Sequence, residues 1–293
     1  MEALVYEAEP NVRVLVHSQR PTGKPIGELI LVHGLEGSSA SGYARSMVHA
    51  ALQRGWVTHR FNMRGCGAAA DELAVTGYHA GQTSDLLAFL RDRRAASSLP
   101  MFVIGFSLGG NVTLKLAGEL GDRAGELLTG VCAVSTPIDL ATCVAALGRP
   151  QNFIYQGRFL DRLKDRIRRK NRLSPDVYTL EHLPKIRTIE EFDDHYTARL
   201  FGFGTAANYF RTQSSNQFLE RIRVPALLIQ SKDDPMIPFS PVFEHPAFAS
   251  NPCLTLLAVE HGGHLGFLSR GKDRFWLDGT VLDWTEALTI APA

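Results

Sequence analysis

A serine between glycines stands where a buried-strand pattern gives way to a helical one. The segment GFSLG (105–109) follows the apolar run 101–104 and opens a helical pattern. A nucleophile on such a turn has a strained backbone that points its oxygen outward, and its neighbours must be small because strand and helix nearly collide. The helix start also offers N–H groups to a developing oxyanion. We therefore predict that Ser107 is a catalytic nucleophile.

A serine hydroxyl is a poor nucleophile until a base accepts its proton, and that base needs an orienting acid. The segment SKDDP (231–235) follows the apolar run 225–230, and the segment EHGGH (260–264) follows the run 253–259. Both segments would lie at the carboxyl ends of strands, in the order Ser, acid, His that one class of serine hydrolase uses. The spacing thus predicts an acid and a histidine that act with the serine.

Spacing alone leaves two adjacent acids as candidates. Counting forward from the strand end selects Asp233, whereas counting back from Pro238 selects Asp234. Pro235 restrains Asp234 towards extended backbone, which helps to hold its side chain in one orientation.

The histidines of the same segment suggest one alternative. His261-x-x-His264 with Asp233 or Asp234 could hold a metal ion, but a metal site would leave the serine turn without a role. We therefore expect no metal and no cofactor. The cysteines show no C-x-x-C spacing and are expected to be buried thiols of a reducing compartment: Cys66, Cys132, Cys143 and Cys253.

The glycine-rich loop HGLEGSSASGY (33–43) follows another apolar run and could supply part of an oxyanion hole. Such a hole needs the N–H after the nucleophile and one N–H from a loop of this kind. We expect these donors to be the amides of Leu108 and Leu35, and we expect His33 to brace the loop. The remaining histidines are interpreted as structural or solvated: His17, His49, His59, His79, His182, His195 and His245.

The scaffold that positions these residues follows from the alternation of strand-like and helical patterns. Such alternation predicts an α/β fold with a mostly parallel, doubly wound sheet. Strands are predicted at 12–17, 28–33, 56–61, 101–105, 131–135, 225–230 and 253–259, and helices at 41–54, 80–94, 108–120, 239–249 and 273–288.

Between about residues 139 and 219 the strand pattern stops and aromatic residues become dense. We predict one domain over 1–293, with a core of 1–138 and 220–293 and a helical insertion, 139–219, over one end of the sheet. The aromatics suggest an apolar roof over the serine. The stretch 157–172 has eight basic residues and an apolar stripe; we interpret it as a helix of the insertion with a solvated face, and docking on anionic lipid is the alternative.

The bulk composition excludes several classes of partner. The chain has 293 residues and a net charge of +1, so no global field favours nucleic acid or an anionic membrane. Its start lacks the pattern of a signal peptide, and no apolar run approaches the ~18 residues of a membrane span. We expect a soluble cytoplasmic protein that binds a small molecule, with no nucleic-acid partner and no stable membrane insertion. The oligomeric state stays open.

Seven segments together resemble the α/β-hydrolase superfamily, and within it the YheT-type branch of esterase-like proteins, whose eukaryotic relatives are membrane-anchored lipases and phospholipases. They occur in family order over most of the chain: HGLEGSSASGY, FNMRGCG, YHAGQTSDL, GFSLGGN, EFDDHYTARLFGF, SKDDPMIP and HGGHLGF. The resemblance implies a Ser107–Asp234–His264 triad and a helical lid between the sixth and seventh core strands. Asp233 would then cap its turn or face solvent. The short N-terminal part shows no anchor, so membrane association is not carried over.

Two charged residues of the family-like segments do not fit a catalytic role. Arg64 and Asp85 are expected to form a buried ion pair or a cap that braces the oxyanion loop.

The expected activity is hydrolysis of carboxylic esters, such as short- to medium-chain acyl esters or acylglycerol-like lipids, through an acyl-enzyme. Acyl transfer or thioester cleavage would use the same residues, because only the acceptor or the leaving group changes. A catalytically silent fold that binds a small molecule or a protein is a third possibility. Such a fold would be expected to have lost a triad residue, and none is lost here.

Overall fold

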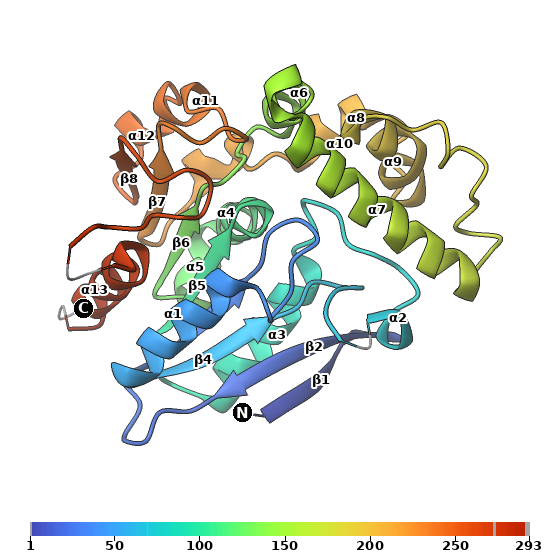
Figure 1. Cartoon of the computed structure of the whole chain (residues 1–293). Coiled ribbons are helices and arrows are strands. Elements are labelled where there is room, and N and C mark those ends of the chain that lie inside the picture. Colours follow the sequence, from blue (N-terminus) through green and yellow to red (C-terminus); the bar gives the residue numbers. More distant parts are fainter. Residues whose placement is uncertain (1, 69, 272–273, 291–293) are drawn as a thin grey trace.

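The computed structural model describes residues 2–68, 70–271 and 274–290. These residues form an eight-stranded sheet with the order β1-β2-β4-β3-β5-β6-β7-β8 (Figure 1). β1 pairs with β2, and β2 with β4, in antiparallel fashion. All the other neighbours are parallel. The predicted α/β fold with a mostly parallel sheet is confirmed.

The strands are β1 (Glu2–Glu9), β2 (Val12–Gln19), β3 (Gly27–Val32), β4 (Trp56–Phe61), β5 (Met101–Phe106), β6 (Gly130–Val134), β7 (Ala226–Ser231) and β8 (Leu254–Val259). The α-helices are α1 (Gly42–Gln53), α2 (Ala70–Leu73), α3 (Ser84–Ala96), α4 (Leu108–Leu120), α5 (Ala124–Leu127), α6 (Leu140–Leu147), α7 (Phe153–Leu173), α8 (Ile189–Phe192), α9 (Ala198–Leu200), α10 (Ala206–Gln213), α11 (Ser240–Phe243), α12 (Ala247–Ser250) and α13 (Trp276–Ile290). Three short helices are of the 3₁₀ type, η1 (Gly121–Arg123), η2 (Pro150–Asn152) and η4 (Ser215–Arg221), while η3 (Asp193–Thr197) is a π-helix.

Helices cover both faces of the sheet, as the doubly wound pattern predicts. On one face, Met47 of α1 and Val281 of α13 share a core with Trp56 and Phe102 of the strands. On the other face, α3 contributes Phe89 to a second core that also includes α4. Strands β3 to β7 are buried along their whole length. Burial on both faces is the reason that their sequences are mostly apolar.

The structure differs from the predicted elements in several places. The short helices α2 and α5 are not among the predicted helices, and the helix predicted at 273–288 begins at Trp276, with residue 273 outside the described residues. The edge strand β1 is not among the predicted strands; its apolar run ALVY (3–6) is short, and most of its residues are exposed. The helix predicted at 80–94 begins only at Ser84. The helix predicted at 239–249 is divided into α11 and α12, with Pro246 at the start of α12, because proline cannot continue a preceding helix.

The 139–219 segment lies between β6 and β7 and is helical, as predicted. It contains α6 to α10 with η2, η3 and the first part of η4, and it contains no strand. Figure 1 shows these helices gathered at one end of the sheet. Leu163 and Ile167 of α7 pack against Phe192 and Tyr196 in a core of the segment's own. Among the described residues, no helix combines the length and the apolar character that crossing a membrane requires.

Candidate active site

Ser107 lies between β5 and α4 in a strained conformation. Its φ is 52° and its ψ is −121°, in a region that residues other than glycine rarely adopt. The neighbouring glycines have no room for a side chain, because a Cβ on Gly105 would lie 2.3 Å from Gly109 O and a Cβ on Gly109 would lie 2.4 Å from Val32 O. The Ser107 N–H donates to Val134 O at 2.8 Å. Strand and helix therefore approach each other as closely as the segment GFSLG predicts.

His264 and Asp234 form a line of hydrogen bonds that ends at this serine. His264 Nε2 lies 2.9 Å from Ser107 Oγ, and His264 Nδ1 lies 2.9 Å from Asp234 Oδ2. The Asp234 side chain has no exposed surface. Its Oδ1 accepts the N–H groups of Met236 at 2.9 Å and Ile237 at 3.1 Å. The carboxylate is thus held by its own turn, while its second oxygen faces the imidazole.

The adjacent acid, Asp233, holds the loop on which His264 lies. Its Oδ1 accepts the N–H groups of Gly262 at 2.9 Å and Gly263 at 2.8 Å, and its Oδ2 lies 3.2 Å from His261 Nδ1. The hydrogen bond from Gly263, together with those from Gly262 and His261, lowers the pKa of Asp233. Asp233 therefore caps the turn of the histidine loop and not its own turn, and its side chain remains partly exposed. The two histidines contact different acids, an arrangement that does not gather them around one metal ion.

Leu35 and Leu108, the expected oxyanion donors, both line the pocket at Ser107. Leu108 is the first residue of α4. Leu35 follows Gly34, where an added Cβ would lie 3.0 Å from Ser107 Cβ. Among the described residues, neither leucine amide has a hydrogen-bond partner, whereas the Gly34 N–H donates to the hydroxyl of Tyr43 at 3.0 Å. Both amides are therefore available to a ligand.

His33 ties the loop 33–43 to the segment after β4. Its Nδ1 lies 2.7 Å from Gly34 O, and its Nε2 accepts the Met63 N–H at 3.1 Å. Burial lowers the pKa of His33 to about 4, so the ring is neutral at pH 7. Arg64 and Asp85 form the predicted buried ion pair. This pair joins the same segment to the start of α3, so it supports the residues to which His33 is bound.

A second buried ion pair, which the sequence does not indicate, links this loop to the 139–219 segment. Arg166 of α7 pairs with Glu36, and each side chain is only 8% exposed. The Tyr78 hydroxyl accepts the Glu36 N–H at 2.8 Å, and the Arg166 guanidinium lies 4.9 Å from the centre of the Tyr78 ring. Separating a buried ion pair is costly. We therefore expect α7 and the loop that includes Leu35 to stay together.

The pocket at Ser107 and His264 contains about 740 Å³ of space between atoms, open solvent at its mouth included. About half of its lining residues come from the 139–219 segment, and most of those are apolar. They are Leu140, Cys143, Val144, Leu147, Phe159, Leu163, Arg166, Ile189, Asp193, Thr197, Tyr209 and Phe210. The predicted apolar roof is present, although it is more aliphatic than aromatic, because several aromatics fill the segment's own core.

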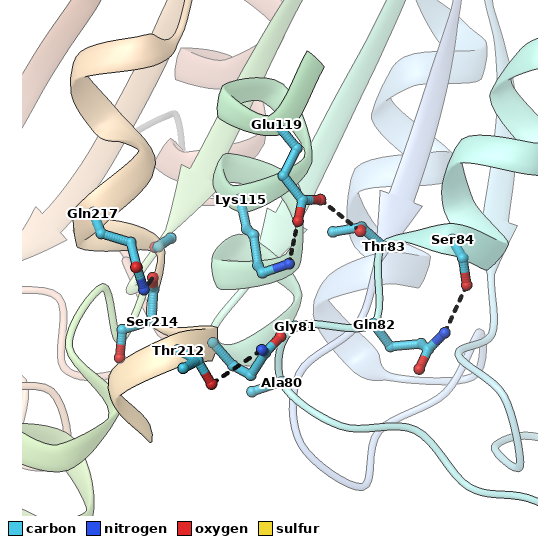
Figure 2. Close-up of polar contacts among 12 residues, drawn as sticks. Ala80, Gly81, Gln82, Thr83, Ser84, Lys115, Glu119, Thr212, Ser214 and Gln217 are labelled. Carbon is cyan, nitrogen blue, oxygen red and sulfur yellow. Dashed lines mark hydrogen bonds and ion pairs between the residues drawn. The ribbon is translucent and has the colours of Figure 1, made fainter. Parts of the chain in front are cut away.

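His79 also lines this pocket, which corrects the interpretation that it is only structural or solvated. Burial lowers the pKa of His79 to about 4. Figure 2 shows that the following strip, 80–84, runs beside α4. There the Thr83 hydroxyl donates to Glu119 at 2.7 Å, and Glu119 also pairs with Lys115. The pocket wall at His79 is thereby fixed to the helix that begins after Ser107.

Comparison with known proteins agrees with this fold. Residues 28–270 match the family model described as alpha/beta hydrolase fold. The chain belongs to the α/β-hydrolase family. Within this family it is similar to the Escherichia coli (strain K12) protein named "Putative esterase YheT", at 34% identity over 87% of this chain and 75% of that protein.

Two other relatives are longer than this chain. The monoacylglycerol lipase of Saccharomyces cerevisiae is 30% identical over 85% of this chain but 56% of its own length, and the phospholipase ABHD3 of Mus musculus is 28% identical over 86% and 59%. The chain thus spans less than two thirds of these relatives.

Among solved structures, Est1E from Butyrivibrio proteoclasticus matches with a TM-score of 0.62, at 10% identity over 99% of each chain. The Pyrococcus furiosus esterase Pf2001 matches with a TM-score of 0.63, at 17% identity over 98% of this chain and 91% of that one. At such identities these two structures show the fold alone. The chain is an α/β-hydrolase homologous to esterases and lipases.

Proposed function

We propose that the protein hydrolyses carboxylic esters, with Ser107, His264 and Asp234 as catalytic residues. The observation that supports this most strongly is the unbroken line of hydrogen bonds from the buried Asp234 side chain through His264 to a strained serine, in the wall of an apolar pocket. Ser107 Oγ attacks the acyl carbon while His264 Nε2 accepts its proton, and Asp234 stabilises the imidazolium. The Leu35 and Leu108 amides bind the oxyanion.

The second half of the reaction uses the same groups. His264 returns the proton to the leaving alcohol, and water activated by His264 then releases the acid from Ser107. His264 is thus the group that accepts and returns each proton in this scheme. The buried thiol of Cys143 also lines the pocket, but burial raises its pKa to about 12. It stays protonated at neutral pH, so it does not compete as a nucleophile.

The proposed substrates are short- to medium-chain acyl esters or acylglycerol-like lipids, and the 139–219 segment acts as the lid of a single domain. The apolar lining supports this substrate class, because each buried methylene contributes about 0.8 kcal/mol at most. The contact of Arg166 with Glu36 supports the lid role, since it joins α7 to the oxyanion loop.

The test is hydrolysis of p-nitrophenyl esters from acetate to palmitate by the parent protein and by Ser107→Ala. The parent should hydrolyse several of these esters, and the variant should lose essentially all activity. Ser135→Ala is a matched control, because Ser135 is also a serine with positive φ, at 49°, and its buried hydroxyl has no hydrogen-bond partner among the described residues. Equal activity in the parent protein and Ser107→Ala would contradict the proposal.

A further inference from the structure

One charged side chain in the pocket has no part in the reaction described above. Asp193 lines the same pocket as Ser107 and His264, in a wall that is otherwise mostly apolar. Placing a carboxyl group there is unfavourable: burial raises the pKa of Asp193 to about 7, although the Thr197 hydrogen bond and the charge of Arg166 act in the opposite direction. A group that weakens the fold and faces the binding pocket is a candidate for substrate recognition.

The local backbone is built to present this carboxyl group. The helix starts with a capping box formed by Thr188 and Glu191. One turn later it widens into the π-helix Asp193–Thr197, where the Ala198 N–H donates to Asp193 O. Such wide turns inside helices are frequent at functional sites. The wide turn places both Asp193 and Thr197 on the pocket.

The carboxyl group has one oxygen to spare. Asp193 Oδ1 accepts the Thr197 hydroxyl at 2.6 Å, and Oδ2 has no hydrogen-bond partner among the residues that the structure describes. Arg166, the nearby cation, is already bound to Glu36 and lies over Tyr78. The adjacent Asp194 has a structural task, because its Oδ1 accepts the Ala206 N–H at the start of α10 at 2.9 Å.

We infer that Asp193 is a specificity residue, whose carboxyl group hydrogen-bonds a hydroxyl of the substrate, so that the site favours esters that carry a free hydroxyl over plain alkyl esters. This rests on the proposed ester hydrolysis. Two features support a neutral partner: the charge of Asp193 itself opposes an anion, and the mostly apolar lining would deprive a cation of its hydration. A hydroxyl also suits both protonation states, because it can donate to a carboxylate and accept from a carboxylic acid.

The experiment compares ester pairs with equal numbers of non-hydrogen atoms, for example 2-hydroxyethyl against propyl hexanoate on the alcohol side, and 6-hydroxyhexanoyl against heptanoyl esters on the acyl side. Hydrolysis is monitored through the release of acid, and the readout is the ratio of the two kcat/KM values within each pair. This ratio does not depend on the fraction of active enzyme, so partial misfolding of a variant does not distort it. The parent protein should prefer the hydroxyl ester of at least one pair by about tenfold to a hundredfold, as a hydrogen bond to a charged group permits.

Asp193→Leu should remove this preference, mainly through a higher KM for the hydroxyl ester, because the contact exists before the reaction begins. Asp193→Asn should weaken it. Thr197→Val keeps the carboxyl group and Asp194→Asn changes the adjacent acid, so both should keep the preference. Two outcomes would overturn this inference but not the proposed function. In the first, the parent protein hydrolyses alkyl esters and prefers no hydroxyl ester; in the second, the Asp193→Leu variant keeps the preference. Failure to hydrolyse either kind of ester would instead overturn the proposed function, and this inference with it.

Discussion

Asp234→Asn should lower kcat by about four decades while leaving the fold intact, as expected when the imidazole loses its orienting charge. The structure indicates how. Asp234 Oδ1 accepts two backbone N–H groups, from Met236 and Ile237, so the introduced amide will keep its oxygen there and turn its NH₂ group towards His264 Nδ1. Nδ1 must then be the acceptor, and the ring proton moves to Nε2. His264 Nε2 would donate to Ser107 Oγ instead of accepting its proton.

Asp233→Asn is the matched control, with the same chemical change one residue away. The introduced amide oxygen can still accept the N–H groups of Gly262 and Gly263, so the loop should keep its shape and kcat should fall about tenfold at most. The assay is steady-state hydrolysis of one p-nitrophenyl ester, with circular dichroism to verify folding. A larger loss for Asp233→Asn than for Asp234→Asn would refute this assignment, and equal small losses would place the orienting acid elsewhere.

Three further predictions follow from the pocket and the turn. Across the p-nitrophenyl series, kcat/KM should rise by up to about fourfold per methylene from acetate to medium chains; equal activity at all lengths would contradict an apolar acyl pocket. Burial raises the pKa of Asp193 from 3.8 to about 7. At pH values between these two, the folded protein binds more protons than the unfolded chain, so its free energy of unfolding falls as the pH rises. Asp193→Asn should therefore gain stability over the parent between about pH 4 and pH 8, by up to about 4 kcal/mol, and a difference in urea unfolding that is independent of pH would contradict this. Gly109→Ala should cost at least about 1–3 kcal/mol, because its Cβ would meet the backbone of Val32. Gly279→Ala in α13, where nothing lies within 4 Å, should instead be neutral or stabilise by about 1 kcal/mol, and equal losses of stability for the two variants would refute the steric account.

The sequence predicts those parts of the fold and the site that local patterns determine. Buried parallel strands have apolar runs, and the residues that follow them lie at one edge of the sheet. The sequence alone therefore predicts that Ser107, the acid segment and the histidine segment lie close together. Pro235 and Pro238 also carry local information, because both favour Asp234, whose carboxylate lies beside the imidazole. β1 gives a weaker signal, since an exposed edge strand needs no apolar face and its apolar run covers only residues 3–6.

The contacts that the sequence does not predict are long-range pairings of charged or polar side chains. Arg166 belongs to a stretch with eight basic residues. Nothing local distinguishes it from exposed residues of that stretch such as Arg162 and Arg168, or indicates Glu36 as its partner. Asp193 is one of two adjacent aspartates, and only the π-helical turn directs it to the pocket while Asp194 caps α10. The position of His79 on the pocket is not predicted either. The loop that places it there is fixed by contacts with α4, and its own sequence does not indicate them.

The most direct test of the account is to identify the residue that a fluorophosphonate probe modifies. The parent protein should react once per chain, and mass spectrometry of the digest should locate the label on Ser107. Ser107→Ala should not react, and the Ser135→Ala control should react at the parent rate. A label on any other residue, or labelling that persists in Ser107→Ala, would contradict the claim that Ser107 is the nucleophile.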